Sequence, residues 1–471
     1  MRVRDAEHGG RPRLTADRRV AADAWVVTGV DGRADRPAGG LGARQSRAPG
    51  PRHLDADMAG AARPAAWRRA FTALADSRAA ATARRMLGRG EHLGVRAEQR
   101  AAVDATDAEG MAADVTAVGA RGAVDRVLVV VVAALIIIGL TMVYSASQYA
   151  VPGDPGYWFR KQLVWATAGV VALAAFARVD YRAWRRVSLW GMLLSLALLV
   201  LVLKVGTTTY GAQRWIVLGP LSIQPSELAK LAMVVYVADW LAAKGDDVTT
   251  VLYGLIPFGL VTGLVLALVV LQNDLGTAII IGGMALAMFF AAGANIAKLV
   301  PTITPLAVLG FFGLVLGRGF RRARLAAFLN PLPPGCQDAT SYQVCQGLIS
   351  LGSGGFFGRG LGAGVLQAGY LPNPFTDSIF AVLGEELGLF GCALVLGLFA
   401  VLAFRGFRTG RRAPDVYGAL LACGITCWLV LQAVVNVGAV VDAIPFTGVP
   451  LPFVSYGGSS LVVSLAAVGL L

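Results

Sequence analysis

Long apolar runs, separated by short polar connections, are the feature that most constrains this chain. They begin near residue 127 and continue to the last residue, so that 56% of the 471 residues are hydrophobic and only 15% are charged. A water-soluble fold has no means of covering that much apolar surface. The pattern therefore predicts a polytopic membrane protein.

About ten of these runs approach the length of roughly 20 apolar residues that crosses a bilayer as a helix. We expect an all-α fold with a large extracytoplasmic loop over residues 318–377, between the seventh and eighth helices. The last run stops at Leu471, so we expect its helix to be truncated. The expected helices cover residues 127–147, 162–177, 187–204, 227–243, 251–271, 275–293, 299–317, 378–404, 416–440 and 454–471.

Residues 1–123 differ from the rest in composition. They are rich in Arg, Ala and Gly and contain no long apolar run. This composition is typical of a disordered segment, here a cytoplasmic tail, and the missing apolar core excludes a signal peptide. Either the tail is a genuine appendage or the start codon is assigned too early, with Met111 as an alternative start. Residues 124–471 form the expected transmembrane domain.

The net charge of +13 predicts an orientation and a membrane surface as partner. No nucleic-acid-binding motif accompanies it, so no nucleic-acid partner is expected. The basic segments 178–186 and 405–412 fall on one side of the membrane if about ten helices cross it. With a cytoplasmic N-terminus that side is the inside. A basic cluster at the end of the seventh helix then lies outside, where an anionic ligand is its natural partner: Arg318, Arg321, Arg322 and Arg324.

Histidine and cysteine usage excludes several kinds of site. All three histidines, His8, His53 and His92, precede the apolar region. The membrane part therefore has no Ser-His-Asp or Cys-His site and no histidine metal ligand. The five cysteines form no CxxC pair, which argues against a metal knuckle. Cys336 and Cys345, both in the expected outer loop, either form a disulfide or stay reduced.

A polar segment precedes the fourth expected helix. Ser226 is placed to cap this helix, and Glu227 lies at the positive end of its dipole. Glu227 and Lys230 are three residues apart and can meet on one helix face, either as an internal ion pair or as part of a site.

Two further charged residues lie near expected outer ends of helices. Arg214, next to Trp215, can reach lipid phosphates or hold a substrate phosphate. Asp274 lies directly before the sixth expected helix, where it serves either as a cap or as part of a site.

The most irregular segment runs from residue 352 to residue 391. Its glycines, in GSGGFFGRGLGAG, either cradle a phosphate with backbone N–H groups or form a flexible surface loop. No strand precedes them, so they are not a P-loop. Asp377 follows a Leu-Pro-Asn-Pro turn and either caps the eighth helix or acts as a catalytic base. Glu385 and Glu386 lie about two turns deeper. Because neighbouring residues on a helix point about 100° apart, at most one of the two faces a given cavity. We expect one of them to pair with a cation or a backbone group.

A proline-rich loop at 445–460 contains Ser459. This loop and the segments just described occur in a specific order. The blocks are GAQRW with QPSELAKLA, NDLGTA, YQ before LISLGSGGFFGRGLG, YLPNPFTDSIFAVLGEELG, and PLPFVSYGGSSL. In this order they resemble the SEDS family (shape, elongation, division, sporulation) of FtsW and RodA proteins. The resemblance covers about residues 124–471, and the sequences of these motifs are closer to the FtsW branch than to the RodA branch.

The resemblance implies a membrane enzyme of about ten helices that polymerises lipid II into peptidoglycan strands. It also implies the bacterial cytoplasmic membrane as location, with a class B penicillin-binding protein (a transpeptidase) and other division or elongation proteins as partners. The family's proposed catalytic acid corresponds to Asp377. Three positions depart from the family pattern, since ionisable side chains are usual where this chain has Gln367, Asn373 and Phe375.

The implied reaction suits the residues at hand. Lipid II carries its own leaving group, a lipid diphosphate, so one carboxylate acting as general base on the acceptor's 4-hydroxyl suffices for an inverting transfer. The diphosphate needs cations, either arginines alone or arginines with a divalent metal ion such as Mg²⁺ or Mn²⁺. The candidate substrate-binding residues are Arg214, Arg318, Arg321, Arg322, Arg324, Arg359, Glu227, Lys230, Asp274, Glu385, Glu386 and Ser459.

Two other functions stay open on the sequence alone. A lipid II transporter would use buried charges, such as Glu227, Lys230 and Asp239, as a polar path between helices. Against it, the informative residues cluster in outer loops rather than at the bilayer midplane. A catalytically silent scaffold would instead recruit division proteins through the Arg-rich tail.

Overall fold

The computed structural model describes a helical fold with one small sheet. Its described residues are 124–209, 212–219, 221–294, 326, 328–329, 336 and 341–471. All of them belong to the unit Asp114–Leu471. The expected tail at 1–123 and the expected helix at 299–317 lie outside this described part.

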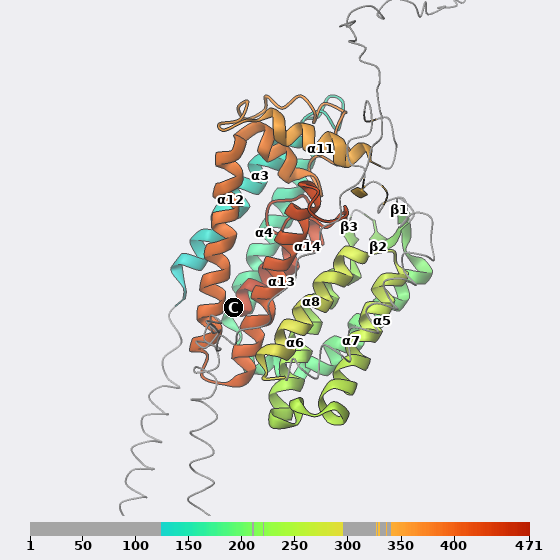
Figure 1. Cartoon of the computed structure of the whole chain (residues 1–471), viewed down its shortest axis with the longest axis vertical. Coiled ribbons are helices and arrows are strands. Elements are labelled where there is room, and N and C mark those ends of the chain that lie inside the picture. Colours follow the sequence, from blue (N-terminus) through green and yellow to red (C-terminus); the bar gives the residue numbers. More distant parts are fainter. Residues whose placement is uncertain are drawn as a thin grey trace, which may run out of the picture. The chain divides into compact units, whose positions relative to one another are not determined.

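The helices follow the apolar runs closely (Figure 1). The α-helices are α3 (Arg126–Ser147), α4 (Tyr157–Arg178), α5 (Ser188–Val205), α6 (Pro225–Lys244), α7 (Ile256–Leu271), α8 (Leu275–Ala291), α11 (Tyr342–Ser353), α12 (Ile379–Arg412), α13 (Val416–Val440) and α14 (Gly458–Leu470). Short helical turns precede α5 and α7: η1 (Tyr181–Val187), η2 (Gly245–Thr249) and η3 (Val251–Leu255).

Five helical segments among the described residues are long and apolar enough to cross a membrane. They are Arg126–Ser147, Tyr181–Val205, Val251–Leu271, Ile379–Arg412 and Val416–Val440. Two further apolar helices, α8 and α14, are shorter. The multi-pass membrane class is therefore confirmed, while the full count of about ten spans stays a prediction.

A three-stranded antiparallel sheet corrects the all-α expectation. Its strands, in the order β1-β2-β3, are β1 (Thr207–Thr209), β2 (Ala212–Leu218) and β3 (Leu221–Ile223). Threonines in β1 and Trp, Ile and Val in β2 favour extended backbone, because β-branched and aromatic side chains suit a pleated surface. The sheet lies between α5 and α6, at the end of the bundle that also carries the start of α8 (Figure 1).

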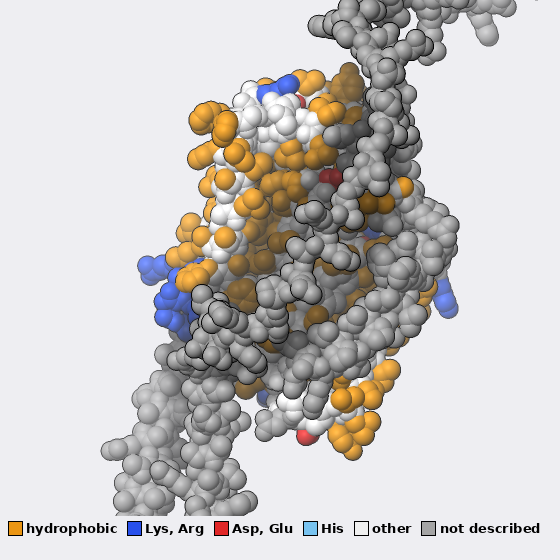
Figure 2. Space-filling view, in the orientation of Figure 1, with side chains coloured by type: hydrophobic (Ala, Val, Ile, Leu, Met, Phe, Trp, Pro, Cys, Tyr) orange, Lys and Arg blue, Asp and Glu red, His pale blue; other side chains and the backbone are white. Residues whose placement is uncertain are grey.

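The helix α13 occupies the centre of the described bundle. Of its most apolar stretch 67% is buried, the highest share among the five candidate spans. The outer helices instead expose large apolar side chains, such as Trp190 on α5 and Leu260 on α7. Hydrophobic side chains also cover most of the described face in Figure 2. Exposed apolar surface of this extent suits contact with lipid acyl chains.

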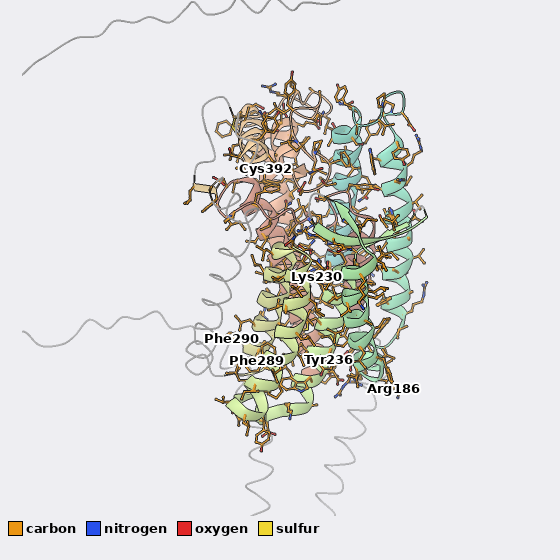
Figure 3. All side chains as sticks on the ribbon, turned by 90° about the vertical axis from the view of Figure 1, so that its right-hand side faces the viewer. Arg186, Lys230, Tyr236, Phe289, Phe290 and Cys392 are labelled. Carbon is orange, nitrogen blue, oxygen red and sulfur yellow. A yellow bond between two sulfur atoms is a disulfide. The ribbon has the colours of Figure 1, made fainter. Side chains whose placement is uncertain are left out.

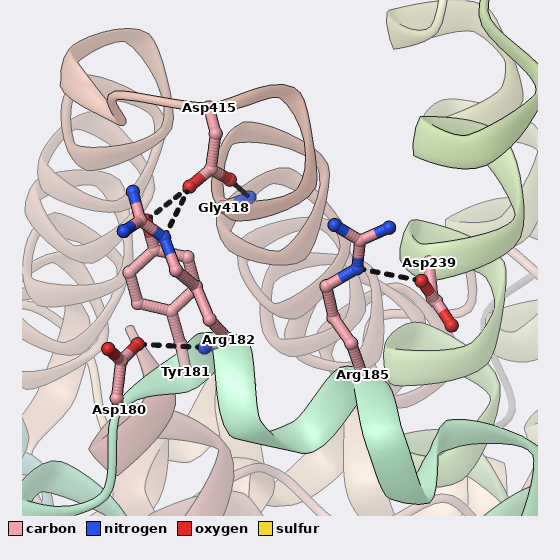
Figure 4. A network of polar contacts seen from close by, with 7 residues as sticks. All are labelled: Asp180, Tyr181, Arg182, Arg185, Asp239, Asp415 and Gly418. Atoms are coloured by element: carbon pink, nitrogen blue, oxygen red, sulfur yellow. Dashed lines mark hydrogen bonds and ion pairs between the residues drawn. The ribbon is translucent and has the colours of Figure 1, made fainter.

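Ion pairs join the basic segment 178–186 to α6 and to the connection between α12 and α13 (Figure 4). Arg182 lies 3.0 Å from Asp415, and Arg185 lies 2.9 Å from Asp239. Although partial burial opposes it, hydrogen bonds from Tyr181, the Gly418 N–H and Arg182 hold the pKa of Asp415 below its usual range. The Arg182–Asp415 contact supports the expectation that segments 178–186 and 405–412 share one side, because Asp415 lies three residues after Arg412. Which side of the membrane this is stays a prediction.

Replacing Gly139 by alanine should destabilise the protein. The new Cβ would overlap the carbonyl oxygen of Phe453 and lie 2.7 Å from the Cα atom of Val454. Both are backbone atoms of the loop before α14, so we expect the free energy of unfolding to fall by about 1–3 kcal/mol. Thermal unfolding of the detergent-solubilised protein, followed by tryptophan fluorescence, measures this loss.

The matched control is Gly191→Ala in α5, where no atom lies within 4 Å of the added Cβ. Its unfolding midpoint should stay or rise, because alanine favours a helix over glycine. Equal unfolding midpoints for Gly139→Ala and Gly191→Ala would contradict the close packing of α3 on the loop before α14.

Candidate functional site

Segments far apart in the sequence converge at one end of the bundle. A Cβ added to Gly276, at the start of α8, would overlap Val449 and lie 3.0 Å from the Cβ of Thr447. A Cβ added to Gly448 would lie 3.4 Å from an Oδ2 oxygen that belongs to Asp377. The start of α8, the loop before α14 and the turn before α12 therefore pack together around Asp377.

Asp377 is half-buried and lies two residues before α12 begins. Thr376 Oγ1 donates to its Oδ1 oxygen at 3.0 Å. The N-cap of α12 is Ser378, which makes no side-chain capping bond. Asp377 therefore lies one residue before the N-cap position of α12, and its carboxylate accepts from Thr376. Its role as a catalytic base stays a prediction.

Arg214 and Asp274 form a polar contact between the sheet and α8. An Nη1 nitrogen of Arg214 lies 3.6 Å from Asp274 Oδ1, and Arg214 also donates to the carbonyl of Asn273. Asp274 accepts from the Thr277 N–H at 3.3 Å, so its predicted capping of α8 is confirmed. Its other oxygen accepts from Gln224 at 3.3 Å. The side chain of Arg214 is 15% exposed, so it is held by protein rather than extended into a lipid surface.

The predicted pair of Glu227 and Lys230 forms an ion pair on α6. Lys230 Nζ lies 2.8 Å from Glu227 Oε2, with both side chains fully buried. Figure 3 places Lys230 in the interior of the bundle. Ser226 does not cap this helix: Pro225 takes the first helical position, where its missing N–H costs nothing, and Gln224 becomes the N-cap without a side-chain bond.

The glycine-rich segment stabilises a break in α12. Gly388 has φ 65° and ψ −164°, which interrupts the helix. Loop N–H groups at Arg359 and Gly360 donate to the carbonyls of Glu385 and Glu386, each at 3.0 Å. In return, the Leu389 and Phe390 N–H groups donate to the carbonyls of Gly355 and Phe356, at 2.9 and 3.1 Å. These bonds replace helical ones, as buried backbone requires.

Glycine in this segment also permits close packing on α12, a role that neither expectation included. A Cβ at Gly358 would overlap the carbonyl of Glu386 and lie 2.6 Å from the backbone nitrogen of Leu387. Only a residue without a side chain permits this approach, and the φ of +77° also favours glycine. The N–H groups of residues 359 and 360 are used on α12, so they are not available to cradle a phosphate.

Glu385 and Glu386 are fully buried and point to different neighbours. Glu385 accepts from the Val365 N–H at 2.8 Å and from Ser350 Oγ at 2.9 Å, with Arg359 3.8 Å away. Glu386 accepts from Ser145 Oγ on α3. The expectation that one of the two pairs with a cation or backbone group is confirmed for Glu385; a contact of either with substrate stays a prediction.

An aromatic cluster beside Asp377 could not be predicted from the sequence. The ring of Phe375 lies 5.2 Å from Trp158 and 5.8 Å from Tyr456, between ring centres. The Tyr456 N–H also donates to the Phe375 carbonyl at 2.8 Å. Burial raises the pKa of Tyr456 to about 12. The three aromatic residues come from segments more than 80 positions apart, so no local pattern links them.

The other candidate residues are placed as follows. Ser459 is buried in the first turn of α14, and its Oγ has no hydrogen-bond partner among the described residues. Cys336 and Cys345 form a disulfide, which decides the question that the sequence left open. No group of three or more His, Cys, Asp or Glu side chains that could hold a metal ion occurs in the described part. The cluster Arg318, Arg321, Arg322 and Arg324 lies outside it.

Comparison with known sequences identifies relatives over most of the chain. The profile FTSW_RODA_SPOVE, described as cell cycle protein, matches residues 125–471. Stage V sporulation protein E of Bacillus subtilis is 42% identical over 355 residues, which are 74% of this chain and 95% of that protein. The probable peptidoglycan glycosyltransferase FtsW of Geobacter metallireducens is 39% identical over 353 residues, 74% of this chain and 93% of the relative.

Two solved structures are similar in fold. A chain from a study of the structural coordination of polymerization and crosslinking by a peptidoglycan synthase complex matches with a TM-score of 0.63 and 30% identity, covering 74% of this chain and 96% of that chain. The rod shape determining protein RodA of Thermus thermophilus matches with a TM-score of 0.56 and 30% identity, over 74% and 95%.

Truncating Glu385 to alanine should destabilise the loop that supports α12. The change leaves the Val365 N–H without its acceptor and removes one of the two acceptors of the buried Ser350 hydroxyl, which keeps the Ala381 carbonyl at 3.2 Å. We expect a cost of about 1–3 kcal/mol. The unfolding midpoint of the purified protein measures it.

Arg359→Ala is the comparison variant, because the Arg359 side chain is 43% exposed and its pairing distance to Glu385 is long, at 3.8 Å. It should cost less than about 1 kcal/mol. If both variants lowered the midpoint equally, Glu385 would be held by the ion pair and not by the loop.

Proposed function

Because the chain belongs to the FtsW, RodA and SpoVE family of membrane proteins, we propose that it is a peptidoglycan glycosyltransferase that polymerises lipid II with Asp377 as general base. The observation that carries this proposal is the convergence of three separate segments on Asp377. Thr376 bonds to its carboxylate, Gly448 lies close to it, and the start of α8 packs against the Gly448 loop.

The reaction transfers one glycan from its lipid diphosphate to the acceptor's 4-hydroxyl. The bond from the anomeric carbon to the diphosphate oxygen breaks, and a bond from that carbon to the acceptor oxygen forms. Asp377 takes the proton of the hydroxyl as the new bond forms. The diphosphate leaves as an anion, so no second acid is needed to protonate it, and attack from the opposite face inverts the anomeric carbon.

The leaving diphosphate needs positive charge close to it. Among the described residues, Arg214 lies at this end of the bundle beside α8, and the half-exposed Arg359 lies on the loop that packs on α12. Arg318, Arg321, Arg322 and Arg324, which lie outside the described residues, are the further candidates. A divalent ion such as Mg²⁺ or Mn²⁺, bound with the substrate, would neutralise the same negative charge. Other candidate residues would support these cations from the interior of the protein: Glu227, Lys230, Asp274, Glu386 and Ser459.

The proposed setting is the outer face of the bacterial cytoplasmic membrane, with the N-terminus in the cytoplasm. The relatives named FtsW support a role in cell division. The match to a chain of a peptidoglycan synthase complex supports a crosslinking partner, which we propose to be a class B penicillin-binding protein. Such a partner would crosslink the strands that this chain polymerises.

One observation favours a second candidate function, the transport of lipid II across the bilayer. Lys230 and Glu227 are 0% and 1% exposed within a helix of the bundle, and buried charges in membrane proteins often line a transport path. Here, however, Lys230 is also bound by Gln432 at 2.6 Å. A lysine fixed by both Glu227 and Gln432 suits a structural role better than a transport path.

Asp377→Asn should abolish polymerisation while the protein still folds. Asparagine keeps the shape of the side chain but accepts no proton, and a positioned base contributes about 10²–10⁴-fold to a rate. The assay mixes purified protein, the partner transpeptidase and lipid II, and separates glycan products on a gel. The unfolding midpoint of the variant should stay close to that of the wild type.

The control is Asp154→Asn, which changes a carboxylate in the loop between α3 and α4 that pairs with exposed Arg160. It should polymerise at the wild-type rate. An Asp377→Asn variant that still makes glycan strands would rule out the proposed base, and lipid II movement without polymerisation would favour transport.

A further inference from the structure

A stripe of buried polar side chains runs along one face of α13. Trp428, Gln432 and Asn436 are four residues apart, so they lie one above another on the same side of the helix. Each is at most 1% exposed. Polar groups buried in an otherwise apolar helix need partners, and the partners here lie in two loops and in α6.

Asn436 joins the two loops that meet at Asp377. Its Nδ2 group donates to the backbone carbonyl of Asp377 at 2.9 Å and to the backbone carbonyl of Val449 at 2.7 Å. One side-chain amide therefore uses both hydrogens to hold residue 377 against the loop before α14.

Gln432 continues the same connection one turn earlier in α13. Its Nε2 group donates to the carbonyl of Pro450 at 2.9 Å. Its Oε1 oxygen accepts from Lys230 Nζ at 2.6 Å and from Trp428 Nε1 at 2.9 Å. Consecutive carbonyls of the loop, at 449 and 450, are thus tied to one rigid helix face and through it to the buried cation of α6.

This arrangement sets what the carboxylate of Asp377 faces. Gly448 directly precedes Val449, has a φ of +69°, and lies so near the carboxylate that an added Cβ would be 3.4 Å from Asp377 Oδ2. The distance between Gly448 and the carboxylate therefore depends on the two bonds from Asn436. The backbone on the other side of Asp377 is held by Phe375, whose carbonyl accepts from Tyr456.

We propose that Asn436 is a positioning residue for Asp377, which sets the place of its carboxylate by bridging the backbones of the two loops. This inference rests on the proposed role of Asp377 as a base. Asn436 acts through backbone carbonyls and not on the substrate. Its loss should therefore slow the chemical step while leaving the affinity for lipid II almost unchanged.

The geometry sets the expected loss of kcat. A displacement of about 1 Å in a reacting group can cost about 100-fold in rate. Asn436→Ala removes both bonds, so kcat should fall by about 30- to 100-fold, with KM for lipid II within about twofold. Asn436→Ser keeps one hydroxyl donor, which can reach at most one of the two carbonyls at a time, so its kcat should lie between those of the wild type and the alanine variant.

The control removes a buried polar group from the same helix without touching the loops. Thr426 is fully buried on α13, and its Oγ1 donates to the Ala422 carbonyl within the helix at 2.7 Å. Thr426→Val should leave kcat and KM unchanged even if it lowers the unfolding midpoint. The full-length protein with its transpeptidase partner is used throughout, with lipid II as substrate and the rate of strand formation measured over a range of lipid II concentrations.

Each outcome decides the proposal. A wild-type kcat for Asn436→Ala, or a loss that appears only in KM, would overturn it. A kcat loss for Thr426→Val as large as that for Asn436→Ala would show a merely structural effect and would also overturn it. If Asn436→Ala fails to fold, the serine variant decides: a kcat equal to that of the wild type rejects the positioning role.

The variant Asp377→Asn, measured alongside, separates this inference from the proposed function. An inactive Asp377→Asn together with a fully active Asn436→Ala would reject only the positioning role. An active Asp377→Asn would reject the base itself, and the role of Asn436 with it.

Discussion

The need to satisfy backbone polar groups away from water is the constraint on which this structure depends. A regular helix satisfies its own N–H and C=O groups, but a broken helix or a loop at membrane depth needs partners from the rest of the protein. At Gly388 the partners are four backbone bonds to the glycine-rich segment. At Val449 and Pro450 they are the side chains of Asn436 and Gln432.

The same constraint explains why the candidate site lies where it does. Irregular backbone gathers at one end of the bundle because α12, α13 and α8 supply the donors and the close-packed glycines that it needs. Asp377 lies in that irregular backbone, held on one side by the aromatic cluster at Phe375 and on the other by Asn436. Contacts of this kind fix the backbone of Asp377, as the positioning of a catalytic group requires.

The sequence predicts interactions within one element far better than contacts between elements. The Glu227–Lys230 pair and the Asp274 cap need only helix spacing, and both were predicted correctly. The small sheet was missed, because apolar periodicity dominates a membrane sequence and hides a short β-hairpin. The packing of the glycine-rich segment on α12 was missed for another reason: it depends on a break at Gly388, 30 residues away from Gly358. The partners of Asn436 lie in two different loops, so no local pattern marks that residue.

The central claim is that the carboxylate of Asp377 meets the acceptor hydroxyl in the assembled site. A structure of the Asp377→Asn variant bound to lipid II, with its transpeptidase partner present, tests this most directly. The account predicts that the acceptor's 4-hydroxyl oxygen lies about 2.6–3.2 Å from the side chain at position 377, with the diphosphate of the donor on the far side of the anomeric carbon. An acceptor sugar bound elsewhere, with residue 377 facing only protein, would contradict the account.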